Sequence, residues 1–425
     1  MSALIIFGLL TVLMLTGMPI SISLGLTVLT FLFTMTQVPV EAVALKLFTG
    51  IEKFEIMAIP FFILAGNFLT HGGVAKRMIN FATALVGHWR GGLALGGILA
   101  CALFAAVSGS SPATVVAIGS ILLPAMVKQG YPMKFGVGVI GTAGGLGILI
   151  PPSIVMVIYA VSTNSSIGQL FIAGIVPGLL LTALLMFVTW FIAKKRGYPC
   201  MPKADLAARF KAFRECVWGL LLIVVVIGGI YTGIFTATEA AAMSAVYAFV
   251  VAVFVYKDMK FKDVPKTLLA AANMSAMILY IITNAVLFSF LLTSEQIPQQ
   301  LTAWITDLGL GPVGFLVMVN LLLLAAGNFM EPSSILLITA PLLFPMAMQL
   351  GIDPIHLGII MTVNMEIGMI TPPVGLNLYV ASGISKLGLT ETTKACAPWI
   401  LVMLAFLLLI TYVPIISLWL PRLLF

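Results

Sequence analysis

Apolar runs about as long as a membrane span alternate with short polar segments along most of the 425-residue chain. A run of roughly 20 apolar residues is long enough to cross the hydrocarbon core of a bilayer as a helix. In the second half of the chain this pattern predicts helices over 217–235, 236–256, 267–292, an amphipathic 296–310, 312–328, 332–350, a broken 355–385, and 396–420. The pattern therefore predicts an all-α polytopic membrane protein.

The first half of the chain repeats the second at a constant, gap-free offset of 221 residues. The coinciding positions include Pro124 with Pro345, Gly130 with Gly351, Pro151 and Pro152 with Pro372 and Pro373, Ala160 with Ala381, and Pro177 with Pro398. Subtracting 221 predicts helices over 3–16, 19–36, 46–71, 74–90, 91–107, 113–128, 134–165 and 170–193. The short segment 3–16 fits equally well as part of one long kinked helix with 19–36. Internal repeats of this kind are typical of secondary transporters.

The basic residues predict how the two halves are oriented. Seven of the 21 Lys and Arg residues lie between Lys194 and Glu215, and four more lie in 257–266. Because positive loops stay in the cytoplasm, both segments are expected inside. Counting outward places 18 basic residues inside and leaves Lys46, Lys53 and Arg422 outside. Two parallel repeats of ordinary spans are the alternative, but they would put Arg77 and Arg90 outside.

This orientation requires that 91–128 and 312–350 each return to the side from which they entered, as re-entrant hairpins. Equivalent segments then face opposite sides, which makes an inverted-topology repeat with its sites near the midplane. The expected organisation is scaffold helices 1–73, an amphipathic arm 74–90, a transport half 91–193 (hairpin 91–128, broken helix 134–165), a cytoplasmic loop 194–216, scaffold helices 217–292, a second arm 293–311, and a transport half 312–425 (hairpin 312–350, broken helix 355–385).

Composition narrows the function classes. The chain is 61% hydrophobic and 8% charged, with a mean hydropathy of +1.18, whereas soluble domains carry about 25% charged residues. The net charge of +7 is spread over short clusters between apolar runs, so no nucleic-acid partner is expected. Four cysteines without paired spacing predict neither a disulfide framework nor a metal cluster. Walker, GxSxG, HExxH and CxxC motifs do not occur in the sequence.

The first candidate site is the hydroxyl-rich break Ser108–Pro112 between apolar runs. At the tip of a hairpin its carbonyls and hydroxyls suit a hard cation such as Na⁺, while the N-terminus of the next helix presents amides to an anion. The structural alternative is a close contact of small residues with serines bonded back to the helix.

Its repeat equivalent, Asn328–Ser334, places Glu331 at hydrocarbon depth. An intramembrane acid is costly and is a functional candidate by default. Glu331 could ligate a cation, balance its charge or exchange a proton. The alternative is an N-cap carboxylate that only structures the hairpin tip.

A third pair of motifs, 141–153 and 362–377, carries the double prolines. Two adjacent prolines remove two backbone donors and force an unwound stretch, which exposes carbonyls to a cation. Side-chain oxygens nearby come from Thr142, Thr371, Asn364 and Asn377. The alternative is a proline kink satisfied by neighbouring helices. Glu366, one turn before the second break, is either a coupling group or a packed acid that shares a proton with a carbonyl.

Weaker signals have structural interpretations. Glu239 stands three residues after Thr236, which is the spacing of a capping box. His71, His88 and His356 lie at the ends of segments and are expected at the membrane interface rather than in a catalytic role.

At these residues the chain resembles the large membrane subunit, DctM-like, of tripartite ATP-independent periplasmic (TRAP) transporters. The resemblance spans essentially the whole length. Its motifs are Gly233–Ala242, Ser108–Thr114, Gly351–His356 and Glu366–Asn377.

The resemblance implies a sodium-driven importer of an organic acid anion, such as a C4-dicarboxylate or sialic acid, in the bacterial inner membrane. Its implied partners are a small membrane subunit of four helices and a periplasmic substrate-binding protein. It also implies an elevator mechanism, in which the hairpin-containing transport domain slides against the scaffold.

Together, the motifs and the resemblance give two sets of candidate residues. Candidate ligands of the substrate are Ser110, Ser111, Pro112, Pro332, Ser333 and Asn377. Candidate ligands of Na⁺, the co-transported ion, are Ser108, Gly109, Ser110, Thr142, Gly145, Pro151, Asn328, Glu331, Asn364 and Thr371.

Three other functions remain open from the sequence. A stand-alone sodium/anion symporter or sodium/proton exchanger would need no binding protein. A membrane enzyme with Glu331 and Glu366 as an acid/base pair is disfavoured because the repeat separates them. A structural subunit is disfavoured because polar breaks at the midplane are expensive to keep without use.

Overall fold

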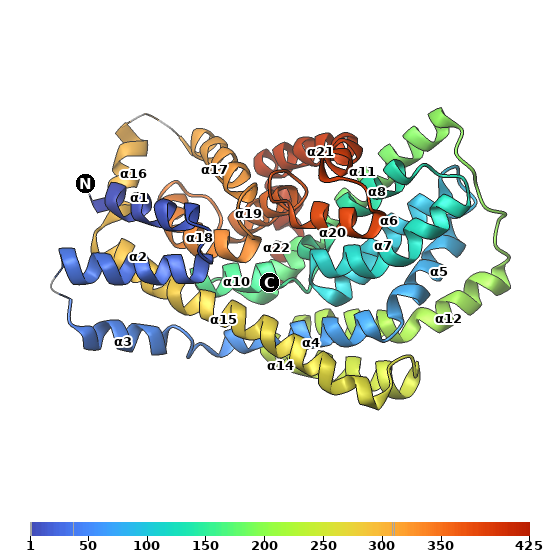
Figure 1. Ribbon diagram of the computed structural model, residues 1–425, viewed down its shortest axis with the longest axis horizontal. Coiled ribbons are helices and arrows are strands. Elements are labelled where there is room, and N and C mark those ends of the chain that lie inside the picture. Colours follow the sequence, from blue (N-terminus) through green and yellow to red (C-terminus); the bar gives the residue numbers. More distant parts are fainter. Residues whose placement is uncertain (1, 37, 308, 310) are drawn as a thin grey trace.

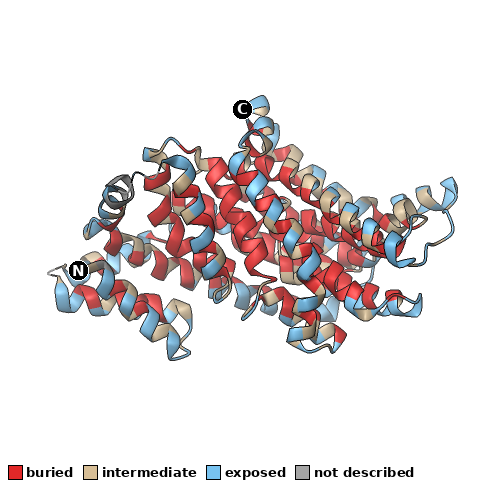
Figure 2. Cartoon of the chain, turned by 90° about the horizontal axis from the view of Figure 1, so that it is seen from above, coloured by how far each residue is buried: buried red, intermediate tan, exposed pale blue. Residues whose placement is uncertain are grey.

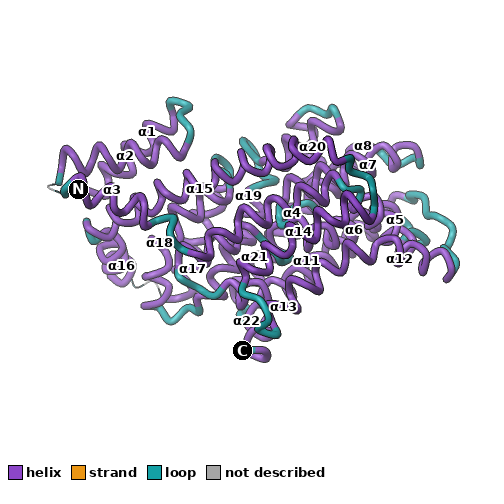
Figure 3. The backbone as a smooth tube through the Cα atoms, turned by 90° about the horizontal axis from the view of Figure 1, so that it is seen from below, coloured by secondary structure: helices purple, strands orange, loops and turns teal. Residues whose placement is uncertain are grey.

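The computed structural model describes residues 2–36, 38–307, 309 and 311–425. Helices account for the regular structure throughout this part of the chain, and no strand occurs in it (Figures 1 and 3). Nine of the helical segments found there are long and apolar enough to cross a membrane. The prediction of an all-α membrane protein is confirmed.

The elements of the first half follow the predicted order. They are α1 (Ser2–Leu15), α2 (Ile20–Met35), α3 (Val40–Thr49), the short 3-10 helix η1 (Phe54–Met57), α4 (Ala58–His71), α5 (Val74–Val86), α6 (Gly92–Ser108), α7 (Ser111–Lys128), α8 (Met133–Ala143), α9 (Leu146–Leu149), α10 (Ile154–Thr163) and α11 (Ile167–Arg196). Helices α1 and α2 are separate and pack against each other, which settles the question of a single kinked helix.

The second half has the equivalent elements. They are α12 (Leu206–Ile223), the π-helix η2 (Val224–Gly228), α13 (Gly229–Tyr231), α14 (Ala237–Val250), the π-helix η3 (Val251–Val255), η4 (Phe261–Asp263), α15 (Val264–Ser294), α16 (Ile297–Asp307), α17 (Pro312–Gly327), α18 (Pro332–Gln349), α19 (Pro354–Gly368), α20 (Leu376–Ser385), α21 (Leu389–Tyr412) and α22 (Ile415–Leu424). Residues 308 and 310 of the predicted second arm lie outside the described residues.

Three predicted boundaries are wrong. The segment 46–71 is split into α3 and α4, because Gly50 closes α3 and the charged Glu52 and Lys53 follow it. The predicted loop 194–216 is largely helical: α11 continues to Arg196, and α12 begins at Leu206, whose amide is capped by the Asp205 side chain at 2.7 Å. The predicted helix 396–420 begins earlier and is divided in two by a break before α22.

The packing of the two halves is reciprocal. Helix α10 packs on α18, the second arm of the other half's hairpin, and its equivalent α20 packs on α7 in the same way. Likewise α8 contacts α21 while the equivalent α19 contacts α11. Contacts that recur after the halves are exchanged indicate a pseudo-two-fold relation, which agrees with the predicted inverted repeat.

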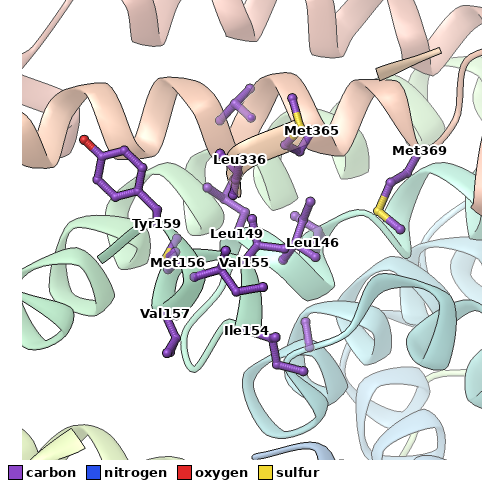
Figure 4. Close-up of a cluster of buried hydrophobic side chains, with 14 of the residues drawn as sticks. Leu146, Leu149, Ile154, Val155, Met156, Val157, Tyr159, Leu336, Met365 and Met369 are labelled. Atoms are coloured by element: carbon purple, nitrogen blue, oxygen red, sulfur yellow. The ribbon is translucent and has the colours of Figure 1, made fainter. Parts of the chain in front are cut away.

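The core lies where the two halves meet. Buried residues gather along the middle of the molecule, and its outer helices carry the exposed ones (Figure 2). Leu336 of α18 lies among Leu149, Met156 and Met365, all buried, so side chains from both halves fill one cluster (Figure 4). This shared core holds the breaks and the hairpin tips in place.

Candidate functional site

The tip of the first hairpin is a compact turn between α6 and α7. Gly109 adopts a left-handed conformation (φ 62°) that ends α6, and Ser110 is the N-cap residue of α7. The Ser110 carbonyl accepts from both the amide and the hydroxyl of Thr114, at 3.1 and 2.8 Å. The hydroxyls of Thr114 and Ser108 lie 3.1 Å apart. The tip therefore holds several oxygen atoms in a fixed arrangement.

This tip packs directly on the proline break of its own half. The Gly109 carbonyl lies 3.5 Å from the amide of Ile154, just after the prolines. A Cβ atom at Gly109 would lie 2.8 Å from the Pro152 carbonyl oxygen, so a side chain there would push the two apart. The predicted residues Ser108, Gly109, Ser110 and Pro151 are thus brought together at one place.

The second hairpin has the equivalent contact. The amide of Val374, just after the Pro372–Pro373 break, donates to the Asn328 carbonyl at 2.9 Å. Both proline pairs contain a cis peptide bond. In each half, therefore, a carbonyl of the hairpin tip faces an amide of the unwound stretch.

Glu331 stands at the N-cap position of α18, but its side chain makes no capping bond to the backbone there. Its carboxylate accepts instead from the hydroxyl of Ser334 at 3.2 Å. The interpretation of Glu331 as a purely structural N-cap carboxylate is therefore not supported.

Asn377 joins the two halves. Its amide nitrogen donates to the Ser111 hydroxyl at 2.7 Å and faces the Gly141 carbonyl at 3.4 Å. Ser111 lies on the first hairpin, whereas Asn377 follows the proline break of the second half. The Asn377 Oδ1 atom is buried and has no hydrogen-bond partner among the described residues. This oxygen is a free acceptor at the junction of the halves.

Glu366 is fully buried, and neither carboxylate oxygen has a hydrogen-bond partner in the described part of the chain. This burial agrees with the packed-acid alternative, and the sharing of its proton with a carbonyl stays a prediction. Gly145 lies directly opposite: a Cβ atom built there would lie 2.6 Å from Glu366 Cγ and 2.8 Å from Oε1. These two residues are repeat equivalents, so their contact lies close to the pseudo-two-fold axis.

The remaining predicted ligands bond mainly to their own helices. The hydroxyls of Thr142 and Thr371 donate to the carbonyls of Gly138 and Ile367. Asn364 is fully buried and donates to Asn320 of α17 at 2.8 Å, while its Oδ1 has no partner among the described residues. These hydroxyl and amide groups donate their hydrogens to other groups of the protein. Their oxygen atoms remain available as acceptors.

Two glycines that fix the site were not found by sequence reasoning. A Cβ atom at Gly147 would lie 2.6 Å from the Ser110 carbonyl oxygen, and one at Gly368 would lie 2.8 Å from the Gly327 Cα atom. They are equivalent at the offset of 221, and each lets its broken helix approach the hairpin of its own half. Matching glycines in the repeat alignment would have revealed them.

The weaker sequence signals have mixed outcomes. The predicted capping box is confirmed, because Glu239 accepts from the Thr236 amide at 2.8 Å and the Thr236 hydroxyl accepts from the Glu239 amide at 3.2 Å. His356 is buried inside the protein, with Nδ1 at 2.7 Å from the Ser417 hydroxyl. It ties α19 to α22, which the sequence did not predict.

Chemically, the site offers oxygen acceptors and exposed backbone groups. Carbonyls, amide oxygens and carboxylates are the ligands that hard cations prefer. No group of three or more His, Cys, Asp or Glu residues able to hold a metal ion occurs among the described residues. The arrangement thus offers oxygen acceptors to a cation and the N-termini of α7 and α18 to an anion.

Comparisons with known proteins agree with this geometry. A model of the DctM component of tripartite ATP-independent periplasmic transporters matches residues 7–416. The chain is 72% identical to the C4-dicarboxylate TRAP transporter large permease protein DctM of Rhodobacter capsulatus, over 100% of both chains. It is 37% identical to the sialic acid TRAP transporter large permease protein SiaM of Vibrio cholerae, over 96% of this chain and 95% of that one.

Among solved structures, the YdaH transporter of Alcanivorax borkumensis, described as having an unusual topology, shares the fold. The TM-score is 0.63 at 18% sequence identity, with 90% of this chain and 88% of the other covered. Transporters of the matched family combine the large membrane subunit with a small membrane subunit and a periplasmic binding protein, and the chain works in such an assembly. Its apolar helices make it a multi-pass membrane protein. The chain belongs to the DctM family of large permease subunits of TRAP transporters.

Proposed function

We propose that this subunit imports a C4-dicarboxylate across the bacterial inner membrane, driven by an inward sodium gradient. A periplasmic binding protein delivers the anion, and a small four-helix subunit accompanies the large one. The choice of substrate is supported by the relatives: those of Rhodobacter capsulatus and Pseudomonas aeruginosa, 72% and 55% identical, are both named for C4-dicarboxylate. Relatives named for sialic acid and 2,3-diketo-L-gulonate are 37% and 34% identical.

The observation that carries the proposal is the meeting of both hairpin tips with the proline breaks. Each meeting point combines carbonyls, side-chain oxygens and a helix N-terminus. Sodium beside these tips would offset the charge of a carboxylate held by the first amides of α7 and α18. Asn377, bonded to Ser111 across the halves, would couple the two points.

The same organisation suits an elevator movement. The two hairpins and two broken helices pack reciprocally on one another, so they can move as one body. Helices α1 to α4 of the first half and α12, α14 and α15 of the second would form the scaffold. The amphipathic α5 and α16 would be the arms that link it to the moving body. Sodium then couples to transport by ordering the tips before the anion binds.

Uptake by reconstituted protein tests the proposal. Proteoliposomes carrying this chain and its small subunit are expected to accumulate labelled succinate only with binding protein and an inward sodium gradient. Accumulation by the large subunit alone would favour a conventional symporter. Uptake that ignores sodium, or that is driven only by a proton gradient, would contradict the sodium assignment.

The site assignment has its own test. Ser110→Ala and Glu331→Ala, at equivalent positions of the two tips, are expected to abolish uptake while the protein remains folded in the membrane. Asn273→Ala, on an exposed face of α15, serves as the matched control and should transport normally. Sodium-dependent uptake at the normal rate by both tip variants would remove them from the site.

A further inference from the structure

Two of the three basic residues that the charge pattern leaves on the outer side line one cavity. This cavity has a volume of about 410 Å³ and contains both Lys46 and Lys53. Its walls come from α3 and the segment after it, from α10, from α15 and from α18. Scaffold and transport elements therefore both contribute to it.

The two ammonium groups have no carboxylate partner within 4.0 Å in the described part of the chain. Lys46 Nζ lies 5.4 Å from the centroid of the Phe290 ring. Lys53 Nζ donates to the Val161 carbonyl at 2.9 Å and to Asn164 Oδ1 at 2.6 Å, both at the C-terminal end of α10. Two positive charges thus face a shared space without a fixed negative side chain bonded to either.

Three of the four hydroxyls that line the cavity already donate to the protein. Those of Thr49, Ser162 and Thr293 donate to carbonyls of their own helices, at 2.9, 2.8 and 2.8 Å. The lysines are therefore the charged donors available to an anion, beside the Ser289 hydroxyl and the Asn164 amide, which also line the cavity. Charge-assisted bonds from ammonium to carboxylate are about twice as strong as neutral ones.

The cavity also lies close to the second hairpin tip. Leu337 and Pro341 of α18 line it, and α18 begins at Pro332. The five residues between Pro332 and Leu337 correspond to about 8 Å along a helix axis. By contrast, the hairpin 312–350 contains no Lys or Arg, and the hairpin 91–128 contains only Lys128, at the end of α7 away from its tip.

We propose that this cavity is a receiving site, in which Lys46 and Lys53 bind the two carboxylates of a small dianion before it reaches the hairpin tips. Two unpaired lysines match a dianion in charge, and the volume accepts one compact diacid. That the dianion is the transported substrate rests on the proposed function. In the elevator scheme both lysines stand on the static scaffold, so the moving half would carry the anion away from them.

Chemical protection of Lys46 tests the site without relying on transport. Lys46 is exposed, so an amine-acylating reagent should modify it in the assembled complex, with the modified lysines identified by mass spectrometry. Succinate is expected to slow this modification several-fold, whereas neutral succinamide should not. Lys203, an exposed lysine far along the chain in the loop before α12, is the control and should react equally with both.

Kinetics give the second readout. Lys46→Gln is expected to raise the KM for succinate roughly tenfold with little change in kcat, since one charge-assisted contact is lost. Lys46→Arg should restore most of the loss. Arg422→Gln removes the third basic residue of the same side, outside the cavity, and should behave as the unmodified protein.

The outcomes separate the two proposals. Absence of protection at Lys46 in a preparation that transports succinate would overturn the receiving site and leave the proposed function standing. Protection by succinate in a preparation that does not transport it would support the site and refute the assigned substrate. An unchanged KM in Lys46→Gln would also overturn the site.

Discussion

The two proline breaks have the same backbone construction but different surroundings. Pro151 and Pro152 are buried, as are Ser108 and Gly109 of the facing tip. In the second half Pro372 and Pro373 are exposed, and Phe329 at the facing tip is 65% exposed. One unit is enclosed by the rest of the chain, and the other is open on one side.

Their side chains differ in the same sense. At the equivalent positions the first half has Ser110, Gly145 and Met156 where the second has Glu331, Glu366 and Asn377. Both halves thus keep the proline pair that unwinds the helix, and only the second half has acids and an amide at these positions. The first unit is therefore enclosed and keeps the hydroxyls of its tip, while the second adds acids and amides and is open on one side.

The largest effect is expected when two equivalent residues of the breaks, one polar and one apolar, are each replaced by alanine. Asn377→Ala is expected to lower uptake roughly 100-fold, because the buried Ser111 hydroxyl loses its partner across the halves. Met156→Ala, at the equivalent position, should lower the melting temperature while uptake per folded molecule stays within about threefold. Vesicle uptake and thermal unfolding of both variants measure this. Similar losses of uptake in the two variants would show that both breaks contribute equally to transport, which would contradict the comparison.

Accessibility tests the enclosed and open tips directly. In a background without the four native cysteines, Phe329→Cys is expected to react with a water-soluble maleimide on the order of tenfold faster than Ser108→Cys, its repeat equivalent. The reason is exposure, since Ser108 is 2% exposed. The two labelling rates are measured in membranes with the small subunit present. Equal rates would mean that both tips are open or both are covered.

The contact at the symmetry axis should affect stability more than it affects transport. Gly145→Ala is expected to lower the melting temperature by a few degrees, at about 2 °C or less per kcal/mol lost in a chain of this length, because its Cβ would meet Glu366. Adding Glu366→Asp, a shorter acid, should recover part of the loss. Gly383→Ala is the control, since a Cβ there would meet nothing within 4 Å. An unchanged melting temperature in Gly145→Ala would contradict the close contact.

The smallest effect is expected at the scaffold. The capping box of Thr236 and Glu239 opens α14, whereas the equivalent α2 begins after Pro19 without a side-chain cap. Glu239→Gln should therefore lower the melting temperature by about 1–2 °C and leave uptake unchanged. A large loss of uptake would instead assign Glu239 a part in transport.

The sequence predicted the features that depend on local backbone chemistry. Prolines in register marked both breaks, and short hydroxyl or acid clusters marked both hairpin tips, because these residues act on the backbone wherever they stand. The predicted helix boundaries were wrong where a few charged residues start or end a helix. Glu52 and Lys53 interrupt a run that is otherwise apolar, and Asp205 caps a helix inside a basic segment.

Contacts between the halves could not be predicted in the same way. The bond from Asn377 to Ser111 joins residues 266 apart, and nothing in either motif specifies the other. The contact of Gly145 with Glu366 could have been predicted, because the repeat alignment pairs these two residues. Residues on a two-fold axis meet their own equivalents, so an acid aligned with a glycine was the available signal.

That last contact bears on why the two repeats must differ in sequence. A dimer of two identical repeats would place the same residue on both sides of its axis. With Glu366 on both sides, two acids would collide in the core; with Gly145 on both, the acid would be lost. The present pairing requires two different residues at one symmetric position. Joining the repeats in a single chain permits this difference, so the buried acid stands beside a glycine where two identical repeats would bring two acids together.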